Sequence, residues 1–202
     1  MTGNATLTFT TVNWATPQTV TVTGVDDGPD AGDIAYSIVT STDDANTADA
    51  LYDAVDPADV SVTNTDNDTV GASLVQSGGS TDVSEAGATS DTFTLVLTSQ
   101  PSASVTVNLT YDADISSATS QLTFTTVNWN VAQEVTVTAV DDDIDETSPH
   151  VGVVDFAFVS TDGTYNNLVF SDLNVNVTDN DASAITVSAI SGNTTEAAGT
   201  AT

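Results

Sequence analysis

The side chains in this sequence whose types and spacing could do chemistry are carboxylates gathered in short clusters. Ca²⁺ takes six to eight oxygen ligands, mostly carboxylates and carbonyls, so such clusters are candidate calcium sites. One set of candidate ligands comprises Glu85, Asp112, Asp114, Asp141, Asp142, Asp143, Glu146, Asp179 and Asp181. An earlier stretch repeats part of this set with Asp26, Asp27, Asp30, Asp33, Asp66 and Asp68, and Glu196 stands near the C-terminal end.

The chain has no permanent cation that could neutralise these acids. Its 202 residues include 29 acidic residues, one histidine and no lysine, arginine or cysteine, for a net charge of −29. Self-repulsion of this size opposes a compact state unless salt screens the charges or metal ions neutralise them. Clustering favours metal ions. Mg²⁺ demands strict octahedral geometry, and transition metals prefer imidazole or thiolate, so the sequence predicts Ca²⁺.

The same composition excludes several functions. Without lysine or arginine the chain has no charges to neutralise nucleic-acid phosphates or anionic lipids. No apolar run is long enough to insert in a membrane, and no signal peptide follows Met1. An enzyme would depend on carboxylates, hydroxyls and one imidazole. The sequence shows no sign of an aromatic-lined cleft near the carboxylates. His150 is expected at a loop or strand edge, where no catalytic partner for it can be identified. The sequence therefore does not predict an enzyme.

Alternation of apolar and polar residues dominates the chain and indicates an all-β fold. Segments such as 92–98 and 134–140 place valine or leucine on one face and threonine on the other. This pattern is typical of antiparallel sheets with one solvated face. Seven strands are expected in the central part of the chain, near residues 71–77, 91–98, 104–111, 120–127, 133–140, 151–160 and 171–178.

Internal repetition sets the expected domain organisation. Residues 7–27 match residues 122–142, and VTNTDND at 62–68 matches VNVTDND at 175–181. We expect tandem immunoglobulin-like antiparallel β-sandwich repeats. Residues 69–181 form one complete repeat, residues 1–68 the later four strands of a preceding repeat, and residues 182–202 the first strand of a following one. Partial repeats need a neighbouring chain or further sequence to close them.

This architecture predicts that the acidic clusters meet. In an immunoglobulin-like sandwich the loops after the first, third and fifth strands lie at the same end as the end of the last strand. Four acidic clusters would therefore converge at one pole of residues 69–181, which is also the junction between repeats. The loops SQPSAS and VNWNVA at the opposite pole contain no acid. A metal ion at the acidic end would stiffen the joint.

These motifs carry a family resemblance. The order VSEAG, LTF…QEVTVTAVDDDIDE and VTDND is similar to the Calx-beta family, known from sodium–calcium exchangers, integrins and large bacterial surface proteins. The resemblance covers residues 69–181 fully and residues 1–68 in part. It implies calcium ligands at Glu85, Asp141, Asp142, Glu146, Asp179 and Asp181. The usual GTA…G.DY stretch before the fourth strand is missing, so Asp112 and Asp114 match only loosely.

The function these features predict is structural. The threonine-rich, lysine-poor sequence resembles repeats of giant bacterial adhesins and surface filaments. We expect a calcium-stabilised rigid spacer at the cell surface, whose partners are neighbouring repeats or identical subunits, with strand exchange between subunits as a further hypothesis. One alternative is a carbohydrate- or protein-binding module using Trp14 and Trp129, although large aromatic residues usually pack inside the fold. Another is a halophilic surface without specific metal.

Overall fold

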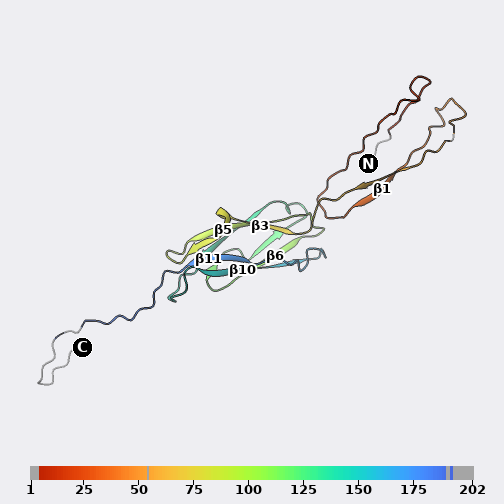
Figure 1. The fold of residues 1–202 in the computed structure, drawn as a ribbon. Coiled ribbons are helices and arrows are strands. Elements are labelled where there is room, and N and C mark those ends of the chain that lie inside the picture. The colour runs from red at the N-terminus through yellow and green to blue at the C-terminus, as the bar shows by residue number, and fades with distance from the viewer. Residues whose placement is uncertain (1–4, 54, 190–191, 193–202) are drawn as a thin grey trace. The chain divides into compact units, whose positions relative to one another are not determined.

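The computed structural model describes residues 5–53, 55–189 and 192, shown in Figure 1. The chain divides into two compact units, Met1–Thr69 (unit 1) and Val70–Thr202 (unit 2). Within the described residues the only helical element is a short 3₁₀ turn, η1 (Ser77–Gly79). The prediction of an all-β fold is confirmed.

Unit 2 contains two sheets. The first has the strand order β3 (Ala72–Gln76), β5 (Ser90–Leu97), β9 (Gln133–Ala139) and β7 (Ile115–Ser116). The second has the order β4 (Asp82–Ser84), β11 (Leu173–Thr178), β10 (His150–Ser160), β6 (Val105–Tyr111) and β8 (Gln121–Phe124). All strand pairs are antiparallel except β4 with β11, which is parallel. The seven strands predicted for this region are all present, and β4 and β7 are short additions.

The core of unit 2 lies between the two sheets. Alternate residues of each strand point inward, as in β9, where Val135 and Val137 are buried while their neighbours face solvent. Phe93 of β5 meets Phe156 of β10 edge to face, with ring centroids 5.8 Å apart. The threonine–valine alternation therefore builds a β-sandwich whose connecting loops gather at its two ends.

The end of unit 2 opposite the acidic loops is held by polar contacts. Tyr165 donates its hydroxyl to the carbonyl of Ser99 at 2.7 Å. Asp162, which is buried, accepts hydrogen bonds from the backbone N–H and the hydroxyl of both Ser102 and Thr164. Among the described residues Asp162 is the only buried acid at this end, and both of its carboxylate oxygens accept hydrogen bonds from neighbouring residues.

Unit 1 contains a single pair of described strands, β1 (Ile34–Ile38) and β2 (Val60–Asn64). Segments 6–12 and 18–25, the first two of the four strands expected in residues 1–68, contain no assigned strand. Their counterparts in unit 2, β8 and β9, pair with β5, β6 and β7. Unit 1 has no described counterpart of those partners, so the strand prediction was wrong for want of a hydrogen-bonded neighbour.

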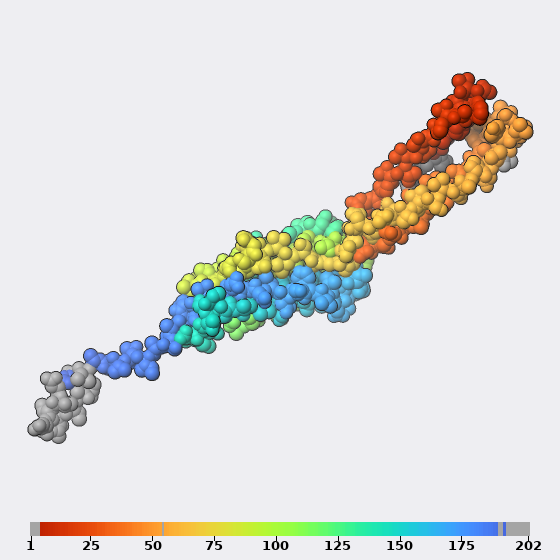
Figure 2. Space-filling model, viewed as in Figure 1, coloured from red at the N-terminus to blue at the C-terminus, as the bar shows by residue number. Residues whose placement is uncertain are grey.

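The missing strands also leave the inner face of unit 1 open. Phe124 of β8 is fully buried, whereas its counterpart Phe9 is 55% exposed. Trp129 is half-buried against the core of unit 2, but Trp14, at the same place in the repeat, is 70% exposed. The expectation that both indoles pack inside holds only for Trp129. In the space-filling view, the red and orange segments of unit 1 are separated by a gap (Figure 2).

Residues 182–189 follow β11 without an assigned strand, and most of the predicted first strand of a following repeat lies outside the described residues. Among residues 5–53, 55–189 and 192, no helix has the length and apolarity needed to cross a membrane.

Candidate metal centre

Glu85 is placed at the end of unit 2 by the strand and turn around it. It follows β4, and its N–H donates to the carbonyl of Thr178 at 3.1 Å, which extends the parallel ladder. A turn then reverses the chain, closed by Ala88 N–H donating to the Glu85 carbonyl at 2.7 Å and made possible by Gly87 with φ of 80°. The Glu85 side chain is only 1% exposed.

Burial governs the electrostatics of Glu85. Loss of solvent raises the pKa of its carboxyl group, and the Asn180 N–H, which donates to Oε2 at 3.2 Å, opposes the rise. The neighbouring charge of Asp179 raises the pKa further. A buried carboxylate in such surroundings gains from any cation that binds beside it.

Asp179 and Asp181, directly after β11, occupy contrasting environments. Asp179 accepts the backbone N–H of Asp181 and that of Glu146, each at 2.7 Å, and these bonds hold its pKa below the usual range. Asp181 has a buried oxygen, Oδ2, with no hydrogen-bond partner among the described residues. Burial, followed by the charge of Asp179, raises the pKa of Asp181. Asp181 Oδ2 is therefore inaccessible to solvent, makes no hydrogen bond among the described residues and lies near the negative charge of Asp179.

The loop after β9 closes over these aspartates. Asp141 accepts the Asn180 side-chain amide at 2.8 Å, and Asp142 accepts the backbone N–H of Ile144 at 2.7 Å. Asp143 is exposed. The charges of Asp143, Asp141 and Asp142 all add to the raised pKa of Asp181. These three acids are exposed to solvent but lie close enough to Asp181 for their charges to act on it.

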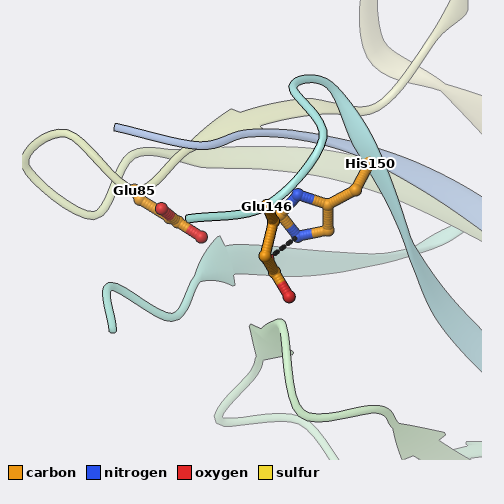
Figure 3. Close-up of side chains that lie close together, drawn as sticks. All are labelled: Glu85, Glu146 and His150. Carbon is orange, nitrogen blue, oxygen red and sulfur yellow. Dashed lines mark ion pairs between the residues drawn. The ribbon is translucent and has the colours of Figure 1, made fainter. Parts of the chain in front are cut away.

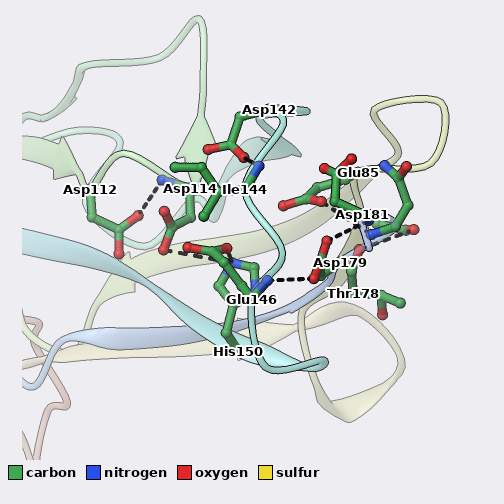
Figure 4. Close-up of polar contacts among 12 residues, drawn as sticks. Glu85, Asp112, Asp114, Asp142, Ile144, Glu146, His150, Thr178, Asp179 and Asp181 are labelled. Atoms are coloured by element: carbon green, nitrogen blue, oxygen red, sulfur yellow. Dashed lines mark hydrogen bonds and ion pairs between the residues drawn. The ribbon is translucent and has the colours of Figure 1, made fainter. Parts of the chain in front are cut away.

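The two acids after β6 take different places. Asp112 accepts the backbone N–H of Val153 at 2.6 Å and that of Asp114 at 3.3 Å, so its carboxylate supports strand β10. Asp114 turns toward the centre, where its Oδ2 lies 3.7 Å from His150 Nε2. Figure 4 shows both residues beside the loop that carries Glu146.

Sequence reasoning missed the position of His150. It is the first residue of β10, as expected for a strand edge, but its side chain is only 14% exposed and lies among the acids. Its Nε2 is 3.1 Å from Glu146 Oε2 (Figure 3). The only hint in the sequence is that the single histidine follows the acidic run 141–146 closely. Chain distance in a loop does not show which side chains meet.

In the part of the chain that the structure describes, two groups of three side chains come close enough to share a cation. Glu85, Asp179 and Asp181 form one group, which we call the oxygen subsite. Glu85, Glu146 and His150 form the other, the imidazole subsite, and in each group the ligand atoms lie within 4.8 Å of one another. We call the end of unit 2 that holds both groups the acidic pole.

Unit 1 repeats the arrangement around Asp66 and Asp68. Asp66 accepts the backbone N–H groups of Ala31 at 2.8 Å and Gly32 at 2.6 Å, and its own N–H donates to Asp33 at 3.0 Å. The N–H of Asp68 bonds to Asp66, and this contact is the main cause of the lowered pKa of Asp66. Asp68 Oδ2 is buried without a hydrogen-bond partner among the described residues, as Asp181 Oδ2 is.

The acids of unit 1 also gather round a hollow. Burial, then the charges of Asp66, Asp26, Asp27 and Asp30, raise the pKa of Asp68. Asp26, Asp27 and Asp66 line a cavity of about 200 Å³. Within the described chain this is a half-site, because unit 1 has no counterpart of Glu85. Glu196, the last predicted ligand, lies outside the described residues.

Solved structures of two other proteins are similar to this chain. No sequence family and no curated protein matches the chain. The apo form of the Calx CBD1 domain is similar in structure, at 19% identity and a TM-score of 0.38, over 55% of this chain and 98% of that one. A FixG-related protein from Vibrio parahaemolyticus is similar at 13% identity and a TM-score of 0.35, over 55% and 97%. The two packed sheets of unit 2 make it a β-sandwich module, and its chemistry must be argued from its own residues.

Proposed function

We propose that the acidic pole binds Ca²⁺ and that the chain is a calcium-stabilised structural module. The observation that carries this proposal is the oxygen subsite, where Asp181 Oδ2 is buried and unpartnered next to the buried Glu85. Burying unpaired carboxylates is costly, and this chain has no lysine or arginine to compensate. The donor set is rich in carboxylates, which fits the preference of Ca²⁺ for many oxygen ligands.

The effect of such an ion would be structural. Glu85 follows β4, and Asp179 and Asp181 follow β11. One ion held by the oxygen subsite would link two segments far apart in the sequence, and the loop before β10 is tied to the same place by the Glu146 N–H, which donates to Asp179. Since the chain has no cysteine, a metal takes the role that disulfides play in many secreted modules. We assign the chain no catalytic activity.

We further propose that the module belongs to an extracellular adhesin or surface filament, in which it acts as a rigid spacer. Extracellular modules bind Ca²⁺ with weak sites suited to millimolar calcium. The repetition of the acids in both units, and the resemblance to Calx-beta repeats, support an array whose partners are neighbouring repeats or identical subunits. The open face of unit 1 is where strands from a neighbour would be exchanged.

The test is thermal unfolding of the full chain at fixed ionic strength, in chelator and then in CaCl₂, MgCl₂ or NaCl. We expect a calcium-specific rise of several degrees, since a ligand at about one hundred times its Kd adds ~2.7 kcal/mol. Glu85→Gln should abolish most of the rise, whereas Asp172→Asn, an exposed acid outside the pole, should retain it.

Two results would overturn the proposal. An equal rise in NaCl would indicate a halophilic surface without a specific site, and no rise in any salt would mean that the acids are merely solvated. Nothing in the described residues favours the carbohydrate-binding alternative: Trp129 packs on the core, and the exposure of Trp14 follows from its missing neighbours.

A further inference from the structure

His150 is the one basic side chain in the whole sequence, and at the acidic pole this side chain is only 14% exposed. Both of its ring nitrogens are inaccessible to solvent, and neither has a hydrogen-bond partner among the described residues. Nε2 faces two carboxylates, Glu146 at 3.1 Å and Asp114 at 3.7 Å. Nε2 thus lies at ion-pair distance from two carboxylates, whereas the solvent-inaccessible Nδ1 has no hydrogen-bond partner among the described residues. Ca²⁺ would use neither ring nitrogen, so the calcium proposal does not account for this imidazole.

The spacing of these atoms suits a small metal ion. Zn²⁺ binds imidazole nitrogen and carboxylate oxygen at about 2.0–2.1 Å, so the ligand atoms of a tetrahedral site lie about 3.3–3.4 Å apart. The two distances from His150 Nε2, 3.1 and 3.7 Å, bracket that value. Glu85 offers a further oxygen within 4.8 Å of both Glu146 and His150. Ca²⁺ takes oxygen ligands and has no use for the imidazole.

Unit 1 provides a natural comparison for His150. The strand register pairs His150 with Val177, the residue two before Asp179, and pairs Ile34 with Asn64, the residue two before Asp66. Ile34 is therefore the counterpart of His150, and unit 1 has no imidazole at this place.

Glu146 is likewise particular to unit 2. Its backbone N–H donates to Asp179, and in unit 1 the N–H of Ala31 donates to the equivalent Asp66. Gly32 donates to the same carboxylate oxygen, so Ala31 or Gly32 stands where unit 2 has Glu146, and neither has a carboxylate side chain. Unit 1 keeps the paired aspartates but lacks both side chains of the imidazole subsite. Their joint presence in unit 2 is hard to attribute to a general need for acidic loops, because unit 1 has those loops without them.

We propose that Glu85, Glu146 and His150 form a second cation site that takes a borderline divalent metal of the Zn²⁺ class, beside the oxygen subsite. The inference rests on the proposed function only in that Glu85 is shared by the two subsites. Asp114 stands next to His150 as a further oxygen donor. The two subsites of the acidic pole would thus select different cations. The oxygen subsite offers only carboxylates and suits a hard ion, whereas the imidazole subsite offers nitrogen and oxygen ligands and suits a borderline ion.

The test uses the full chain without an affinity tag, labelled with ¹⁵N-histidine and titrated with ZnCl₂ in nuclear magnetic resonance. Because the sequence holds one histidine, every imidazole signal belongs to His150. We expect a saturable change of the ring nitrogen signals, complete near one equivalent, and no comparable change with CaCl₂. His150→Gln should weaken Zn²⁺ binding at least about tenfold in competition with a chromophoric chelator, since loss of even an outer-shell partner costs that much.

Asp181→Asn separates this inference from the calcium proposal, because Asp181 belongs to the oxygen subsite alone. It should weaken the response to Ca²⁺ and leave the Zn²⁺ response of His150 in place. If Zn²⁺ leaves the imidazole signals unchanged, or if His150→Gln binds Zn²⁺ as tightly as the native chain, the subsite does not exist. If Zn²⁺ perturbs His150 while Ca²⁺ gives no stabilisation, the subsite stands and the proposed function fails. The spectrum of the native chain decides the matter even if a variant misfolds.

Discussion

At the scale of single residues, each of the two units contains a pair of aspartates with opposite environments. Asp66 and Asp179 are held by backbone N–H groups, which lower the pKa of each. Asp68 and Asp181 each have a buried, unpartnered oxygen, and burial raises the pKa of each. The first aspartate of each pair fixes the loop conformation through its hydrogen bonds, and the second has a carboxylate oxygen that accepts no hydrogen bond from the described residues.

Asp181→Asn should therefore change stability in opposite directions with and without calcium. In chelator the substitution removes a buried like charge and should raise the melting temperature by a few degrees. In millimolar CaCl₂ it removes a ligand and should lower the melting temperature relative to the native chain. Thermal unfolding in the two buffers measures both changes. A loss of stability in both would mean that Asp181 is an ordinary structural residue.

Asp162 predicts a pH dependence at the other end of unit 2. Burial raises the pKa of this carboxyl, but the donors on Thr164 and Ser102 outweigh burial and hold the pKa well below its usual range. A lowered pKa contributes stability that is present above the unfolded value of about 3.9 and is lost as the pH falls below it. Between pH 5 and 2 the native chain should lose stability relative to Asp162→Asn, which should be the less stable of the two at pH 6. Equal slopes in denaturant titrations would contradict this.

His150 shows what residue patterns in a sequence cannot give. The acids could be assigned to one end because loop order fixes where each cluster lies. The partners of His150 depend on how the loop before β10 folds back, and on Asp114 reaching in from the turn after β6. For the same reason Asp112 was expected at the centre with Asp114 but supports the backbone of β10 instead.

At the scale of elements, one glycine sets how closely the sheets approach near the acidic pole. Gly152 is buried in β10, and a Cβ atom there would lie 2.8 Å from Cγ2 of Ile115 in β7. The two sheets can reach this separation only where one strand has no side chain.

Gly152→Ala should destabilise unit 2 by about 1–3 kcal/mol through overpacking. Ile115→Ala, which removes the opposing methyl group, should cost about 2–5 kcal/mol alone, but the double variant should cost less than the sum. Gly163→Ala, with open space around it, is the matched control. Denaturant unfolding followed by Trp129 emission, in a Trp14→Phe background, gives the four free energies. If the two changes in unfolding free energy were strictly additive, the contact between residues 152 and 115 would not determine how closely the sheets approach.

The strands of the sequence could be predicted where their partners are also in the chain. In unit 2 the alternation gave all seven strands, because each alternating segment has a hydrogen-bonded neighbour. The same alternation failed over residues 6–12 and 18–25 of unit 1. The alternation of apolar and polar residues indicates which face of a segment is apolar enough to be buried. A strand forms only when another strand lies beside that segment to accept and donate its hydrogen bonds.

At the scale of the whole molecule, unit 1 is expected to be completed by strands like those of residues 69–119. Fusing a second copy of these residues in front of residue 5 should supply the counterparts of β3 to β7. In a Trp129→Phe background, Trp14 should then become shielded from acrylamide, a neutral quencher that the negative charge does not repel. The same fusion with Leu95→Asp in the added copy should leave Trp14 accessible, because Leu95 is a core residue. Shielding by both fusions, or by neither, would contradict the repeat assignment.

The parallel pairing of β4 with β11 has a consequence for a chain that is pulled from its two ends. β4 lies near the beginning of unit 2 and β11 near its end, and they pair at Asn176 with Asp82, Val177 with Val83 and Thr178 with Ser84. Opposing pulls on parallel strands slide one along the other, so the hydrogen bonds between them are loaded together in shear rather than unzipped one at a time. Glu85 and Asp179 follow directly on these strands, so an ion bound there would add a further link beside these hydrogen bonds.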